Sequence, residues 1–155
     1  MITLLLIVHG LLAVALLGAI THQAFGVVPL AASADRRSFW ARFQNVHAPA
    51  YVGAIIVLFV LTSLLGGVIY PHYRIYVRTF LEDMQMARSN GVFEIKEHLV
   101  AVGLSVLPAY WLFWRTPLQP DDAAARRYLT WLLAFIIWWG FLVGHVLNNI
   151  KGLVP

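Results

Sequence analysis

Apolar residues are grouped into four long segments, which cover residues 1–29, 48–70, 97–114 and 128–148. A helix that crosses the hydrocarbon core of a bilayer needs about 20 mostly apolar residues, and the four segments reach or approach that length. The pattern therefore predicts an all-α integral membrane protein, a four-helix bundle that forms a single transmembrane domain over residues 1–155. The first segment lacks the basic start of a secretory signal, so we expect it to be retained as a span.

Three polar connections, 30–47, 71–96 and 115–127, join these segments. The longest, 71–96, mixes aromatic residues and arginines between Tyr73 and Leu81, which predicts an interfacial helix within it. Pro71 marks the predicted end of the second span. Four crossings place both chain termini and this connection on one side of the membrane, here called side A. The other two connections then lie on the opposite side, called side B.

The distribution of positive charge favours side B as the cytoplasmic side. Side B carries six arginines, beginning with the pair Arg36 and Arg37, whereas side A carries five Lys and Arg residues. Basic residues concentrate in cytoplasmic loops. We therefore expect the N-terminus to lie on the side of the membrane away from the cytoplasm. The expected membrane is the bacterial inner membrane.

Composition supports the membrane assignment and excludes several classes of site. Hydrophobic residues make up 61% of the 155 residues and charged residues 12%, against about 45–50% and 25% in soluble domains. The chain has no cysteine, which excludes disulfides, iron–sulfur clusters and thiolate metal sites. The net charge of +4 forms no basic stripe, so nucleic acid is not an expected partner.

Histidine is the recurrent polar residue of the apolar segments, and each segment contains or borders at least one. Ionisable residues within a membrane are rare and usually functional. Two neutral imidazoles facing an apolar slot between helices are the ligand set of haem b. The six histidines are His9, His22, His47, His72, His98 and His145.

The depth of each histidine sorts the candidate ligands into two groups. At a rise of about 1.5 Å per residue, His9 and His145 lie at the same level near side A. One haem would be bound near side A and a second near side B. The candidates are His9, His98 and His145 for side A, with His72 as a further one, and His22 and His47 for side B.

Helix geometry supports one haem better than two. His9 and His22 are 13 residues apart, which leaves them about 140° out of register on one helix. His47 and His72 could instead be interfacial, and any intramembrane histidine could serve helix packing. For His9 and His145 we expect ligation, because a buried imidazole is costly without a partner.

Charged residues near side A could also contact a ligand. Arg74 and Arg78 lie about one helical turn apart and could bind haem propionates or lipid phosphates. Glu94 and His98 are spaced i, i+4, so on a helix they share a face. This pair could orient the imidazole, relay protons or bind a quinone head group, or it could form a salt-bridged helix start.

The four apolar spans with His9, His22, His98 and His145 resemble the small membrane-bound b-type cytochromes, which include four-helix haem subunits of quinone-linked complexes. The resemblance implies a transmembrane electron carrier with one or two b-type haems and a link to quinone. It would be an electron-transfer subunit of a respiratory or photosynthetic complex, not a stand-alone enzyme. Its partners would be membrane or periplasmic redox subunits and lipids.

Two other functions stay open. A cofactor-free accessory subunit would use the histidines for packing and would be colourless. A metal-handling membrane protein would bind copper or zinc, although the chain lacks the methionine and cysteine clusters that soft copper prefers. The candidate metal ligands are His9, His22, His47, His98 and His145.

Overall fold

The computed structural model describes residues 1–28, 38–44, 47–115 and 122–153, and their regular structure is all helical. The all-α prediction is therefore confirmed for this part of the chain. Arg36 and Arg37 lie outside the described residues. The four long helices are α1 (Ile2–Gly26), α3 (Tyr51–His72), α5 (Ala87–Arg115) and α6 (Asp122–Leu153). The short elements are α2 (Phe39–Gln44), η1 (Ala48–Ala50), η2 (Tyr73–Arg78) and α4 (Thr79–Asp83).

Three helices among the described residues are long and apolar enough to cross a membrane. They are the helical stretches Ile2–Gly26, Ala48–Asp83 and Asp122–Asn149. Helix α5 covers the third predicted span but does not meet this criterion. Its first turns carry Arg88, Glu94, Lys96 and Glu97, which interrupt the apolar run.

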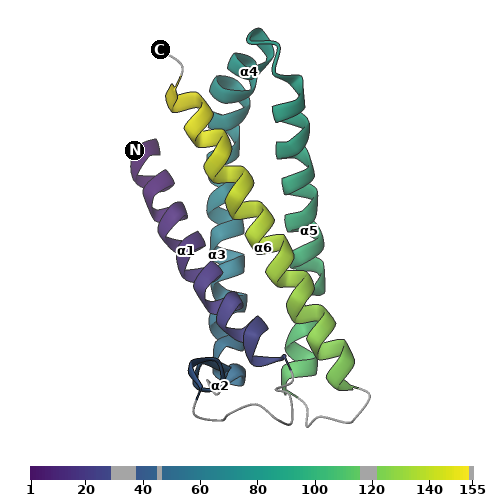
Figure 1. The fold of residues 1–155 in the computed structure, drawn as a ribbon. Helices are drawn as coiled ribbons and strands as arrows, with labels where there is room; N and C mark the ends of the chain where they lie inside the picture. The colour runs from purple at the N-terminus through teal and green to yellow at the C-terminus, as the bar shows by residue number, and fades with distance from the viewer. Residues whose placement is uncertain (29–37, 45–46, 116–121, 154–155) are drawn as a thin grey trace.

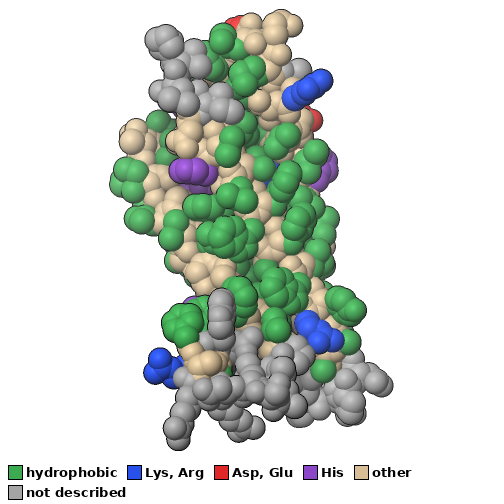
Figure 2. Space-filling model, in the orientation of Figure 1, with side chains coloured by type: hydrophobic (Ala, Val, Ile, Leu, Met, Phe, Trp, Pro, Cys, Tyr) green, Lys and Arg blue, Asp and Glu red, His purple; other side chains and the backbone are tan. Residues whose placement is uncertain are grey.

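The four long helices run side by side (Figure 1). Helix α1 packs on α3 and α6, and α5 packs on α6 and α3. The start of α1, the end of α6 and helix α4 lie at one end of the bundle, which corresponds to side A, and α2 lies at the other end (Figure 1). On the face shown in Figure 2, Lys and Arg side chains lie towards the two ends and hydrophobic side chains cover the middle.

The second predicted span does not end at Pro71. Helix α3 runs through Pro71 to His72 and continues as the π-helical segment η2 and then as α4. Proline has no N–H to donate to the preceding turn, and the wider π-helical turns follow it directly. Residues 73–81 are thus helical as predicted, but they extend α3 towards side A instead of forming a separate helix.

Towards side B, buried polar side chains tie three elements together. Gln23 of α1 is fully buried, and its Oε1 accepts a hydrogen bond from the Tyr110 hydroxyl of α5. Its Nε2 donates to the Ala48 carbonyl of η1 at 3.2 Å. In an apolar interior an amide without partners would cost several kcal/mol, roughly 2–7. The Gln23 junction therefore fixes how α1, η1 and α5 meet.

A second buried junction joins α5 to α6. Trp114 Nε1 donates to Thr130 Oγ1 at 3.3 Å, and Thr130 Oγ1 donates to the Arg126 carbonyl at 2.8 Å. The Arg126 guanidinium lies over the Trp114 ring at 4.7 Å, and its Nε donates to the Phe113 carbonyl at 2.8 Å. These contacts provide partners for the Trp114 indole N–H, the Thr130 hydroxyl and the Arg126 guanidinium where α5 meets α6.

We expect Tyr110→Phe to lower the free energy of unfolding by about 1 kcal/mol, because it leaves Gln23 Oε1 buried without its donor. Denaturant unfolding of the purified protein in detergent measures this change. Tyr128→Phe is the matched control, since Tyr128 is 71% exposed, and we expect no change there. Equal stability of the two variants would contradict the structural role of the Gln23 junction.

Candidate functional site

A cavity of about 380 Å³ lies between the four long helices in the half of the bundle nearer side A. Its wall is formed by residues of α1, of α3 with η2, of α5 and of α6. Binding sites for small organic molecules typically have about 300–1,000 Å³. The cavity is therefore large enough to hold the ring of a small aromatic ligand, and the side chains around it decide which one.

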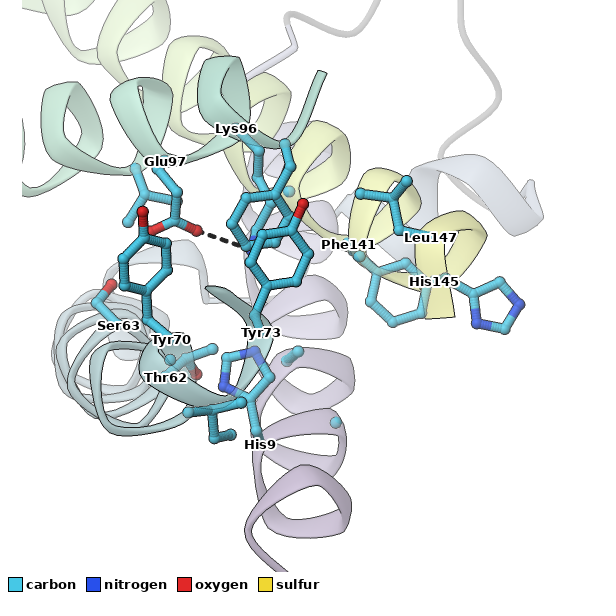
Figure 3. A pocket seen from close by; sticks show the side chains of 18 of the residues that line it. His9, Thr62, Ser63, Tyr70, Tyr73, Lys96, Glu97, Phe141, His145 and Leu147 are labelled. Carbon is cyan, nitrogen blue, oxygen red and sulfur yellow. Dashed lines mark hydrogen bonds and ion pairs between the residues drawn. The ribbon is translucent and has the colours of Figure 1, made fainter. Parts of the chain in front are cut away.

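His9 is the imidazole that points into this cavity (Figure 3). Its ring lies against the backbone of α3, where a Cβ placed on Gly66 would come within 3.3 Å of His9 Cε1. His9 Nδ1 is buried and makes no hydrogen bond of normal geometry to a described residue. Thr62 Oγ1, on the same wall, is also buried without a partner. Two of the residues that line the cavity, His9 and Thr62, thus each hold a buried polar atom that has no hydrogen bond of normal geometry to a described residue.

Two further buried polar atoms lack partners among the described residues, and neither borders the cavity. They are Trp139 Nε1 and His22 Nδ1. The His22 ring is stacked on Phe43 at 4.2 Å and on Tyr51 at 5.8 Å between ring centroids. The His22 imidazole is therefore packed among aromatic rings, away from the cavity.

The side-A end of the cavity carries an ion pair and stacked aromatic rings. Lys96 Nζ lies 3.0 Å from Glu97 Oε1 and 4.3 Å from the centre of the Phe93 ring. Tyr73 stacks on Phe93 with 3.7 Å between centroids, and Tyr70 lies 6.3 Å from both rings. Because Lys96 and Glu97 neutralise each other, this end has no net charge but still offers hydrogen-bonding groups.

His145 borders the same cavity as His9 but does not face it. Its side chain is exposed, and Figure 3 shows its ring pointing away from His9 on the far side of Phe141. The ring is parallel to that of Phe141, and its Nε2 lies 3.1 Å from Asn149 Nδ2. The predicted pair at matched depth therefore meets at one cavity, yet of these two imidazoles His9 alone points inward.

The other predicted histidines occupy different places. His72 borders the cavity and packs on Tyr76 at 4.6 Å. His98 is exposed outside it, with Nδ1 2.7 Å from the Glu94 carbonyl of its own helix. His47 is exposed directly before η1 at side B. The structure thus gathers His9, His72 and His145 around one cavity and leaves His22, His47 and His98 elsewhere.

The two predicted arginine ligands do not line the cavity. Arg78 binds Glu82 at 2.8 Å and Glu94 at 3.4 Å on the exposed side of η2. Arg74 is exposed. The Glu94 carboxylate therefore pairs with Arg78 across two helices, whereas His98 bonds to the Glu94 backbone.

Sequence reasoning did not assign Lys96, Tyr70, Tyr73 or Thr62 to the site. Lys96 and Glu97 looked like the charged start of a helix, and Tyr70 and Tyr73 like interfacial residues. Their grouping depends on α3 continuing past Pro71, which the chain pattern alone does not indicate. The available signal was the group of aromatic residues at 70, 73 and 76, followed by Phe80 and Phe93.

Comparison of the chain with protein-family models, curated proteins and solved structures finds no match. Among the described residues, no group of three or more His, Asp or Glu side chains lies close enough to hold a metal ion.

We expect Thr62→Val to raise the free energy of unfolding of the ligand-free protein by about 1 kcal/mol, because it removes a buried hydroxyl that lacks a partner. Thr130→Val is the matched control. Thr130 Oγ1 is bonded to both Trp114 and Arg126, so its loss should destabilise the protein by a similar amount. Denaturant unfolding in detergent compares the two, and a destabilised Thr62→Val protein would show that Thr62 Oγ1 is already satisfied.

Proposed function

We propose that all four long helices cross the membrane and that the chain is an integral membrane protein with both termini on side A, outside the cytoplasm. Three of the helices are apolar enough on their own. The proposal for α5 rests on its packing against α3 and α6 along the bundle (Figure 1). Its charged residues Arg88, Glu94, Lys96 and Glu97 lie in its first turns, near side A, where they would meet lipid head groups.

This topology predicts which side of the membrane single cysteines face. The chain has no cysteine, so Asp83→Cys, His47→Cys and Ala123→Cys each give one reactive thiol at an exposed position. In sealed vesicles, a membrane-impermeant thiol reagent should label Ala123→Cys from the same side as His47→Cys and from the side opposite to Asp83→Cys. The cysteine-free protein is the control. Labelling of Ala123→Cys from the side of Asp83→Cys would mean that α5 does not cross.

We further propose that the cavity binds the ring of a quinone, and that the chain is a quinone-linked subunit of a membrane redox complex. The observation that carries this proposal is that His9 and Thr62 line a cavity with no net charge and that each has a buried polar atom, Nδ1 and Oγ1, without a hydrogen bond of normal geometry to a described residue. A quinone is an uncharged flat ring with carbonyl oxygens that accept hydrogen bonds. When bound and reduced, it takes up electrons together with protons.

Different residues around the cavity would bind the polar groups and the flat face of such a ring. His9 and Thr62 can donate hydrogen bonds to carbonyl oxygens, while Tyr73 and Phe93 form a stacked aromatic wall at the rim. Lys96, with Nζ held by Glu97, places a further donor at the side-A end. Electrons would be exchanged with a redox group of a partner subunit, as the resemblance to quinone-linked cytochrome subunits implies.

Haem b is the second candidate, and one observation favours it. Gly10, Gly140 and Gly144 line the cavity, and a Cβ added at any of them would meet nothing within 4 Å. That open wall could receive a flat macrocycle, whose iron would be held by His9 together with His145 or His72. We prefer the quinone for two reasons. The His145 ring is turned outward, and the other polar side chains of the cavity, such as Thr62, Tyr73 and Lys96, are suited to hydrogen bonding and not to binding iron.

Quinone binding can be measured through quenching of tryptophan fluorescence by a short-chain benzoquinone added to the purified protein. We expect His9→Ala to weaken binding about tenfold, because one hydrogen bond to the ring is lost. His98→Ala is the matched control, since His98 is exposed outside the cavity, and its affinity should equal that of the parent.

Two outcomes would count against the quinone site. Equal affinity of His9→Ala and His98→Ala would remove His9 from it. A b-type α band in the dithionite-reduced minus oxidised spectrum, lost in His9→Ala and kept in His98→Ala, would replace the quinone with haem b.

A further inference from the structure

The wall of the cavity is polar at one end and apolar at the other. His9, Tyr70, Tyr73, Lys96 and Glu97 lie at the end nearer side A. Along α3 the wall continues from Tyr70 to Phe59, which at about 1.5 Å per residue is roughly 16 Å towards the middle of the bundle. The deep end is formed by the apolar side chains of Leu16, Phe59, Val100, Ile136 and Ile137.

Phe59 closes the deep end against the backbone of α5. Its side chain is 3% exposed, and its ring covers Gly103 so closely that an added Cβ there would lie 2.5 Å from Phe59 Cζ. The same Cβ would lie 3.3 Å from Ile136 Cγ2. A glycine at 103 is therefore what allows the tip of the Phe59 ring to approach α5 so closely, and the position of the Phe59 ring sets the depth of the cavity.

An apolar chain is the ligand part that fits this deep end. The five residues that form the deep end carry no hydrogen-bonding side chain, and the nearest ones in the lining are Thr62 and Ser63, about one helical turn along α3 from Phe59. A polar group placed beyond them would lose its partners. An empty apolar void is also unfavourable, because the atoms that line it lack contacts on one side. A hydrocarbon chain supplies those contacts without bringing a polar group.

We infer that the deep end of the cavity holds the hydrocarbon chain of the ligand and that Phe59, resting on Gly103, is a specificity-determining residue for the length of that chain. This inference rests on the proposed function in one respect, that a quinone ring occupies the polar end. The ring then lies near His9, and the chain runs from it towards Leu16 and Phe59.

The test compares two probes on the full-length protein in detergent, a benzoquinone without an alkyl chain and the same ring with a decyl chain. In Gly103→Ala the added methyl displaces the Phe59 ring towards the cavity, so the affinity for the decyl probe should fall about tenfold while that for the chainless probe stays unchanged. Gly67→Ala is the matched control. Gly67 lies outside the cavity lining and an added Cβ there meets nothing within 4 Å, so both affinities should stay as in the parent.

A second variant keeps the inference testable if Gly103→Ala fails to fold. Phe59→Leu shortens the side chain at the deep end, so the preference for longer alkyl chains over the decyl probe should increase. Failure of the chainless probe to bind the parent would overturn the proposed function itself. Binding of that probe with chain-length preferences that neither variant changes would overturn this inference alone.

Discussion

In a hydrocarbon environment a polar group without a protein partner forms no hydrogen bond, because no water is present to act as the partner. The contrast between the two halves of this bundle follows from that constraint. Near side B, Gln23 is bonded to Tyr110 and Thr130 to Trp114, although His22 Nδ1 there is buried without a partner among the described residues. Near side A the helices enclose a cavity lined by His9 and Thr62, whose Nδ1 and Oγ1 atoms have no hydrogen bond of normal geometry to a described residue. The first half holds the helices together, and the second contains the cavity for which we propose a ligand.

The continuation of α3 beyond Pro71 connects these features. It carries Tyr70 and Tyr73 to the level of the first turns of α5, where Tyr73 stacks on Phe93. The same turns of α5 bring Lys96 and Glu97 to the cavity. One helix extended by a π-helical segment therefore supplies the aromatic rim, and the charged start of α5 supplies a neutral ion pair beside it.

Much of the architecture could be predicted from the spacing of apolar residues. The helical class and the grouping of both chain ends with 71–96 at one end of the bundle follow from the number of apolar segments. The prediction that the second span ends at Pro71 was wrong. A proline need not end a helix, and here the helix continues past it in π-helical form. The charged first turns of α5 also explain why this helix is less apolar than the three candidate spans.

The site was only partly predictable, since depth along a helix can be counted but side-chain direction cannot. Counting placed His9 and His145 at one level, and they do border one cavity. The direction of His145 is set by Phe141 and Asn149 on its own helix, and that of His98 by the Glu94 carbonyl. These contacts within one turn decide which imidazole faces the interior, and no periodicity of the sequence reports them.

The central claim is that the cavity at His9 holds a quinone. The most direct measurement is the quinone content of an organic extract of the protein, purified from its own membrane in mild detergent, alongside the same extract from a His9→Ala variant. The account predicts a quinone in near-stoichiometric amount with the parent chain and a marked loss with the variant. Equal quinone content in both preparations, or none in the parent, would contradict it.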